Sequence, residues 1–253
     1  MEVSHADRGV AALLSSLGST HADGSSWTHA ASNAAMRLTV SSAVIPGVSA
    51  KAFRGEILLP YSCSTIVACT LSLDERCSWD RGIARLASHI VHEPHYRVFY
   101  SATKPAGGGI ISGRDFTDAV FVGPAAELPP TVTAAAARPI ADGAYVSAGA
   151  GLREHPSFPI TPELVRGFNR PSGWLLEPAE PLPPHEVDSH GRPPPDNSNG
   201  WCKVTYIVQP ELSGWLPSSV VNASLSSMFG HFFGDMLAFL QTVAREDLEK
   251  EAS

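Results

Sequence analysis

Apolar residues along this chain recur mainly in short alternating or β-branched runs, a pattern typical of antiparallel strands. Between residues 27 and 59 the runs are MRLTVSSAVI and AKAFRGEILL, separated at Pro46–Gly47. GIARLASHIVHE and HYRVFYSAT follow around a tight turn at Glu93–Pro94, and then RDFTDAVFVG. The remaining runs are AYVSAGAG, LVRGFN, GWLLEP and, last, WCKVTYIV. The pattern predicts one curved sheet of about eight or nine antiparallel strands.

Three segments have a helical pattern instead. A short Ala/Leu helix opens residues 1–25, and SCSTIVACTLSLDERCSWD predicts one helix with Ser62 or Ser64 as its N-cap. The strongest helix runs from Pro217 to about Arg245, roughly 43 Å at 1.5 Å per residue. An amphipathic helix this long needs a broad apolar surface, which the sheet supplies. Its apolar face is formed by Val221, Leu225, Met228, Phe229, Phe232, Met236, Leu237 and Leu240.

Two proline-rich segments interrupt the strand pattern. Residues 124–142 are rich in Ala and Pro and favour a helix only weakly, because prolines flank them. Residues 178–200 combine many prolines with almost no apolar side chains, which predicts a solvated insertion loop between strands.

Composition narrows the class of protein. The chain has 253 residues, 43% of them hydrophobic, and a net charge of −7 with no Lys/Arg run, which argues against a nucleic-acid partner. It contains no stretch of about 18 apolar residues and no signal-peptide pattern at the start. The four cysteines lack CxxC spacing; they are Cys63, Cys69, Cys77 and Cys202. We therefore expect a protein of the reducing cytosol, without a metal or other cofactor.

Three motifs resemble one known family. GWLPSSVVNASLSSMFGHFFGDML, preceded by WCKVTYIVQPELS, resembles the terminal strand and helix of START (StAR-related lipid transfer) domains. SGRDF at 112–116 resembles the family's G-x-R-D-[FV] strand opening, and Trp79 followed by Asp80 resembles the Trp that ends its early helical region. The motifs occur in the family's order over about residues 25–245.

The resemblance implies an α+β helix-grip fold, in which a curved antiparallel sheet of about nine strands is closed by the long C-terminal helix over a lipid tunnel. We therefore expect one START-like domain over 1–253, with a core at about 25–247 and the loop 178–200 inserted. The implied function is binding and transfer of one sterol, ceramide-like or glycerolipid molecule. The expected protein is a cytoplasmic monomer that touches membranes transiently and is not an enzyme.

The motifs are nearest to those of the steroidogenic acute regulatory and ceramide-transfer type members. By that resemblance, Arg76 and Asp80 meet the polar end of the lipid, and Asn169 and Ser101 fall at or near positions that contact the head group. The steroidogenic members place a buried Arg where this chain has Val120, and its acidic partner where Ser101 stands. A strict cholesterol site of that type is therefore not expected.

Each of these residues has a simpler alternative. Arg76 and Asp80 have the i,i+4 spacing of a surface ion pair, and Asn169 could satisfy the edge of a strand. Val221, Leu225 and Phe229 would be core residues in any globular protein, although we expect them to line the ligand or gate its passage. Phe229→Asp is then predicted to abolish lipid binding.

Other features favour structural roles. Arg114 and Asp115 are expected to tie the sheet to a neighbouring loop, and Gly107–Gly109 to form a flexible rim that opens with residues 157–161. Three histidines, His89, His92 and His95, lack a Cys or acidic ligand that would complete a tetrahedral metal site. No local arrangement of residues marks a catalytic acid–base pair.

Two other functions stay open. A helix-grip enzyme of the cyclase or hydratase type would need an acid or base inside the cavity, for which Ser101, Asn169 and Asp118 are the candidates. A lipid-gated interaction module would use the loop 178–200 to bind a protein partner.

Overall fold

The computed structural model describes the placement of residues 1–48, 50–70, 73–180, 200–214 and 216–251. Within these residues ten strands form one sheet, and two further short strands pair separately. The helix-grip architecture predicted from the sequence is confirmed. The interior of the predicted loop 178–200 lies outside the described residues from 181 to 199, and so does Trp215 of the C-terminal motif.

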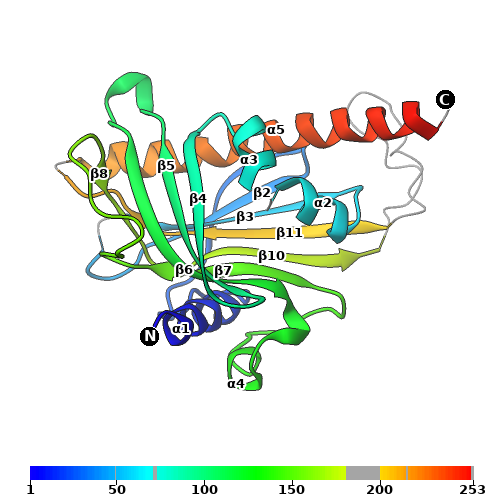
Figure 1. Cartoon of the computed structure of the whole chain (residues 1–253), viewed down its shortest axis with the longest axis horizontal. Helices are drawn as coiled ribbons and strands as arrows, with labels where there is room; N and C mark the ends of the chain where they lie inside the picture. The colour runs from blue at the N-terminus through cyan, green and yellow to red at the C-terminus, as the bar shows by residue number, and fades with distance from the viewer. Residues whose placement is uncertain (49, 71–72, 181–199, 215, 252–253) are drawn as a thin grey trace.

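The sheet has strand order β1-β2-β3-β11-β10-β7-β6-β5-β4, and its neighbours along this path are antiparallel (Figure 1). β8 pairs with β6 in parallel, and β12 pairs with β9 in the small second sheet. The strands are β1 (Thr28–Asn33), β2 (Leu38–Ala43), β3 (Ala52–Leu59), β4 (Ile83–His92), β5 (Tyr96–Thr103), β6 (Arg114–Pro124), β7 (Tyr145–Gly151), β8 (Val165–Arg166), β9 (Phe168–Asn169), β10 (Ser172–Ala179), β11 (Trp201–Val208) and β12 (Pro210–Glu211).

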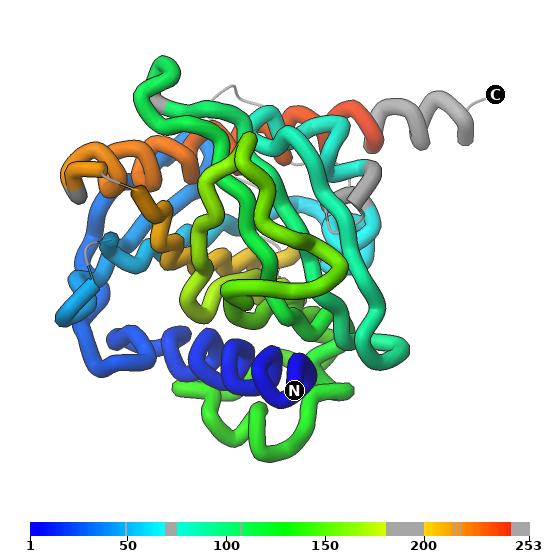
Figure 2. The backbone as a smooth tube through the Cα atoms, turned by 60° about the vertical axis from the view of Figure 1, so that its left-hand side comes forward, coloured from blue at the N-terminus to red at the C-terminus, as the bar shows by residue number. Residues whose placement is uncertain are grey.

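Helices cover both faces of this sheet. α1 (Glu2–Ser15) lies on one face, here called the outer face, and α5 (Ser218–Glu251) lies across the opposite, inner face (Figures 1 and 2). α2 (Cys63–Thr70) and α3 (Leu73–Trp79) both contact α5, and α3 also contacts β4. Among the described helices, none is both long and apolar enough to cross a membrane.

On the outer face, α1 packs closely against β7. Val10, Leu13 and Leu14 are buried in a core cluster with residues of β6, β7 and β10. Gly9 lies directly on the β7 backbone, because a Cβ at this position would overlap the carbonyl of Gly149. The absence of a side chain therefore sets how near the helix comes to the sheet.

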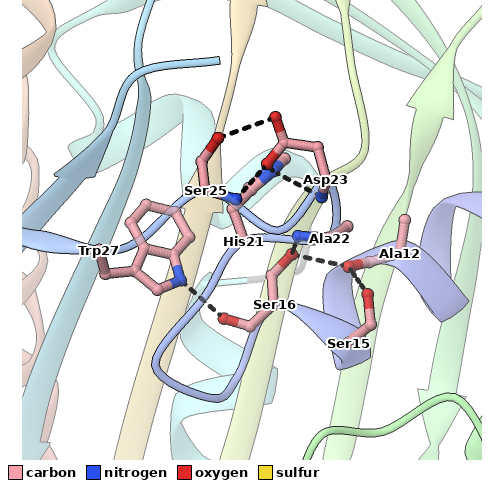
Figure 3. Close-up of polar contacts among 8 residues, drawn as sticks. All are labelled: Ala12, Ser15, Ser16, His21, Ala22, Asp23, Ser25 and Trp27. Atoms are coloured by element: carbon pink, nitrogen blue, oxygen red, sulfur yellow. Dashed lines mark hydrogen bonds and ion pairs between the residues drawn. The ribbon is translucent and has the colours of Figure 1, made fainter. Parts of the chain in front are cut away.

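The chain between α1 and β1 is fixed by side-chain hydrogen bonds (Figure 3). The Trp27 indole Nε1 donates to the carbonyl of Ser16 (3.0 Å), and the Ala22 amide donates to Ser16 Oγ (2.9 Å). Asp23 accepts from both the amide (2.9 Å) and the hydroxyl (3.1 Å) of Ser25. These bonds satisfy polar groups of a loop that would otherwise have to stay in water.

On the inner face, α5 packs on a group of rings here called the aromatic cluster. The central rings of Trp174 and Tyr206 are stacked with centroids 4.3 Å apart. Gly55 of β3 admits the helix, because a Cβ there would overlap the rings of Phe229 and Phe233. The cluster comprises Phe53, Trp174, Tyr206, Phe229, Phe232 and Phe233.

Several boundaries differ from the sequence prediction. The expected single helix over SCSTIVACTLSLDERCSWD is two helices, α2 and α3, on either side of residues 71–72, which are not described. The predicted cap is confirmed, because Ser62 Oγ accepts the amide of Thr65 (3.1 Å). β12 follows the strand predicted to be last, and α5 extends to Glu251 instead of about Arg245.

The segment 124–142 is mostly irregular. It contains a 3-10 turn at Ala125–Glu127 and one short helix, α4 (Pro130–Thr133). Proline at 129, 130 and 139 removes amide donors and limits helix length, which accounts for the weak helical pattern.

Candidate functional site

Strand register identifies which residues face inward. Gly55, which lies under α5, pairs with Tyr206, and Tyr206 pairs with Trp174. The same row continues through Ser147 of β7 to Val122 of β6. Because directly paired residues share a face of a sheet, this row belongs to the inner face throughout.

The residues of β5 that face inward all keep some accessible surface. Asp118 lies four residues from Val122 along β6 and therefore faces inward as well. Phe99 of β5 pairs with Asp118 and shares this face. Phe99 and Ser101 are only partly buried, whereas the outer-face residues Val98 and Tyr100 are almost fully buried. A one-sided strand normally buries the face toward the interior, so this reversal shows that the inner side of β5 is packed less completely than its outer side.

α3 brings Arg76 and Asp80 together above this face. Arg76 Nε donates to Asp80 Oδ2 (3.2 Å), and the two side chains are 20% and 8% exposed. The guanidinium carbon of Arg76 lies 5.6 Å from the ring centroid of Trp174 and 5.3 Å from that of Phe232. A cation over aromatic faces is attracted by their π-electrons. The predicted i,i+4 ion pair is therefore present, but it is mostly buried instead of lying on the surface. Contact of Arg76 and Asp80 with a lipid head stays a prediction.

Tyr206 is a polar group of this region that sequence reasoning missed. Burial raises the pKa of its phenol, and the charges of Arg76, Asp80 and Asp118 act on it as well. Tyr206 nevertheless keeps some accessible surface. The alternation of WCKVTYIV predicted a strand with two distinct faces, but only the register shows that Tyr206 shares its face with the predicted polar residues.

Asp118 and Asn169 form a second polar pair. Asn169 Nδ2 donates to Asp118 Oδ2 (3.0 Å), while Asp118 Oδ1 has no hydrogen-bond partner among the described residues. Burial raises the pKa of Asp118 to about 7, and the Asn169 hydrogen bond and the charge of Arg166 partly oppose this rise. A carboxyl held this way is partly protonated near neutral pH and can donate or accept a hydrogen bond.

The START domain family matches residues 13–246 of this chain. The chain belongs to the START family. A cattle relative, StAR-related lipid transfer protein 5, is 29% identical over 64% of this chain and 61% of its own length. The mouse protein of the same name is 31% identical over 55% of this chain and 50% of its own length. The chain thus spans about half to three fifths of the curated relatives that it matches.

A solved START structure has the same fold. The human StAR-related lipid transfer protein 5 superposes with a TM-score of 0.67 over 86% of this chain and 88% of that chain, at 22% identity. At this identity the likeness concerns the fold alone. The family resemblance inferred from the three motifs is confirmed by the family match over residues 13–246.

Within this START domain, Ser101 of β5 and Val120 of β6 both lie on the inner face. Ser101 pairs with Phe116, and Val120 is buried opposite Arg97 of β5. Arg97 is a second residue that sequence reasoning missed, because its charge acts on the phenol of Tyr145 and its Nε has no hydrogen-bond partner among the described residues. An inner-face cation is therefore present on β5, directly opposite Val120.

α5 packs its predicted residues into the core of the START domain. Val221 and Leu225 are each 6% exposed, and Phe229 has no exposed surface. Their contact with a ligand stays a prediction. Phe229→Asp would place a carboxylate inside the aromatic cluster and disrupt folding, so a loss of lipid binding by this variant would not distinguish the two roles.

The two loops predicted to form a rim carry exposed apolar side chains. Ile110 follows the turn Gly107–Gly109 and is 70% exposed, and Ile160 of the 157–161 loop is 56% exposed. A surface hollow of about 440 Å³ lies in the second loop, lined by Glu154, His155, Pro156, Pro159 and Ile160. A separate hollow of about 570 Å³ lies at 125–144, away from the inner face.

The remaining predicted residues have structural contacts. Arg166 forms a two-pronged ion pair with Asp115 (3.0 and 2.8 Å), which ties β8 to β6, and Arg114 Nε donates to the carbonyl of Leu212 (3.2 Å). These contacts agree with the predicted role in fastening the sheet to a loop. In the part of the chain that the structure describes, no group of three His, Cys, Asp or Glu side chains could hold a metal ion.

Proposed function

We propose that this START domain binds one lipid molecule against the inner face of β4–β6 and carries it between membranes. The apolar body would lie along Phe99 and Val122, and the head group would meet the polar residues nearby. The observation that carries the proposal is the reversed burial of β5, whose inward residues keep accessible surface in a member of a lipid-transfer family.

The polar groups support a head that both donates and accepts hydrogen bonds. Arg76 and Asp80 offer a cation and an anion, and Asp118 offers an unpartnered carboxyl oxygen beside the amide of Asn169. A sterol, a ceramide-like lipid and a glycerolipid all carry hydroxyl or carbonyl groups suited to such a set. Selectivity in an apolar site comes from a few convergent polar groups of this kind.

Loading would require local opening of the structure. The turn Gly107–Gly109, the loop 157–161 and the N-terminal part of α5 are the proposed gate, and the exposed Ile110 and Ile160 suit transient contact with a bilayer. The proposal further takes the carrier to be a cytoplasmic monomer without a cofactor. No covalent chemistry is needed, because transfer exchanges one apolar medium for another.

The decisive experiment combines native mass spectrometry of the purified chain with extraction of bound lipid. We expect a monomer carrying one lipid. Ser101→Phe fills the inner face and should lower lipid occupancy at least several-fold, whereas Ala87→Phe is the matched control, because Ala87 pairs with the outer-face residue Tyr100. Equal occupancy in the two variants, or no lipid in the parent protein, would refute the proposed site.

A helix-grip enzyme remains a second candidate because of one observation. Asp118 faces inward and its pKa is raised to about 7, which suits a general acid or base. The lipid recovered from the protein tests this function. A ligand whose mass changes on incubation with the parent protein, but not with Asp118→Asn, would indicate catalysis, and an unchanged ligand indicates a carrier.

A further inference from the structure

Two cysteines far apart in the sequence meet at the border of the inner face. The sulfur atoms of Cys63 and Cys202 lie 2.9 Å apart, although 139 residues separate them along the chain. Both thiols are free. Cys63 is the first residue of α2, and Cys202 lies in β11 opposite Leu59.

The pair combines one reachable thiol with one protected thiol. Cys63 is partly exposed at the edge of the core, whereas Cys202 has no exposed surface. A disulfide bond is about 2.05 Å long, so the sulfurs would need to approach by roughly 0.9 Å from their 2.9 Å separation. α2 also contacts β10 and α5, which keeps the two thiols together.

We propose that Cys63 and Cys202 form a peroxide-sensitive pair whose disulfide fastens α2 to β11. The Cys63 thiolate attacks hydrogen peroxide, forming a sulfenic acid and releasing hydroxide. The Cys202 thiol then attacks the sulfenic sulfur, the S–S bond forms, and the hydroxyl group leaves as water with the Cys202 proton. The hydroxide takes up the proton that Cys63 lost on ionising, so two thiols lose two electrons, peroxide gains them, and two water molecules result.

Local electrostatics agree with this order of attack. The hydrogen bond shared with Cys202 lowers the pKa of Cys63 by stabilising its thiolate, and the same interaction together with burial raises the pKa of Cys202. Cys63 is therefore the thiol that ionises and reacts first, and Cys202 is the resolving thiol. A third described cysteine, Cys77 on α3, is exposed and pairs with neither.

The link would join the helical segment that leads to the polar site with the strand that carries Tyr206. α2 precedes α3 and contacts it, and Arg76 lies on α3. Oxidation would thus restrict separation of α2 and α3 from the sheet. Its effect on lipid exchange rests on the proposed function, whereas formation of the link does not.

The test uses the full reduced chain, treated with hydrogen peroxide, alkylated and digested without reductant. We expect mass spectrometry to find one peptide pair joined through Cys63 and Cys202, lost on addition of dithiothreitol. Cys77→Ser is the matched control and should form the same link, whereas Cys63→Ala should form none. A parent protein that gives only sulfinic acid at Cys63, or a link through another cysteine, would overturn the proposal.

A second measurement tests the fastening itself. The oxidised chain should unfold at a midpoint temperature higher by on the order of 5–10 °C, because the link closes a loop of about 140 residues. Hydrogen exchange in peptides covering 63–80 should slow in parallel. A mapped link that changes neither the midpoint nor the exchange would show that α2 is not fastened by it.

Discussion

The two faces of the sheet at β5–β7 have opposite kinds of packing. The outer face is dense: α1 lies against the β7 backbone at Gly9, and Leu14, Val98 and Phe121 are fully buried. The inner face of the same strands keeps accessible surface at Phe99 and at polar residues. The comparison shows that the outer side of these strands is packed more completely than the inner side, on which the proposed function places the ligand.

Buried ion pairs lie on both faces. The outer face holds Glu177–Arg138 and Asp115–Arg166, and the inner face holds Arg76–Asp80 and the hydrogen-bonded pair Asp118–Asn169. Burying such groups lowers stability unless a partner satisfies them. Asp118 Oδ1 has no hydrogen-bond partner among the described residues, and the proposed lipid head group would supply one.

The largest expected effect contrasts one residue from each face. Leu14→Ala should lower the free energy of unfolding by about 3 kcal/mol, because it leaves a cavity in the outer core. Phe99→Ala should lower it by less than about 1 kcal/mol, because its ring is incompletely packed. Urea denaturation measures both values. Equal losses would mean that the inner face is packed as densely as the outer face.

Next in size is the inner-face ion pair. Arg76→Leu leaves the buried carboxylate of Asp80 without its partner and should lower the free energy of unfolding by about 2 kcal/mol. Arg76→Lys keeps the charge and should recover part of the loss. Lys203→Gln breaks the more exposed pair with Glu56, which keeps Arg54 as a second partner, and should leave stability almost unchanged. A similar loss for Arg76→Leu and Lys203→Gln would contradict the inward placement.

A pH dependence follows from Asp118. Burial raises its pKa from the usual value of 3.8 to about 7, so the stability gained by holding the carboxyl protonated is fully present below about pH 4 and is lost as pH rises through 7. Between pH 5 and pH 8 the parent protein should lose about 1.5 kcal/mol more than Asp118→Asn, since water at the accessible face screens part of the cost. Parallel pH profiles for the two proteins would place Asp118 in water.

The smallest expected effect concerns the cap of α2. Ser62→Ala removes the acceptor for the Thr65 amide and should cost about 1 kcal/mol. Because α2 lies on the inner side, hydrogen exchange should rise in α2 and stay constant in α1. Ser64→Ala is the matched control, since the Thr65 amide bonds to Ser62 instead. Uniformly faster exchange would show that both faces unfold together.

The fold could largely be predicted because its signals are local. Alternation marked the strands, Pro46–Gly47 marked a turn, and the spacing from Val221 to Leu240 marked α5. The break between α2 and α3 and the two-residue strand β12 were missed, since such short elements depend on tertiary contacts more than on their own residues.

The candidate site was less predictable than the fold. Arg76, Asp80 and Asn169 came from the family resemblance alone, and the structure shows their local contacts. Tyr206 and Arg97 depend on register, which joins residues from strands far apart in sequence. A shift of one residue in either strand would turn both side chains outward, so the sequence alone could not identify them.

In the proposed lipid carrier, the inner side of β6 and β7 would lose a packing partner each time the lipid leaves. The contact of Gly9 with the β7 backbone supports these strands from the outer face. Because α1 lies on the face opposite the ligand, this support would be the same with and without lipid. The sheet would therefore keep its curvature when the lipid is released.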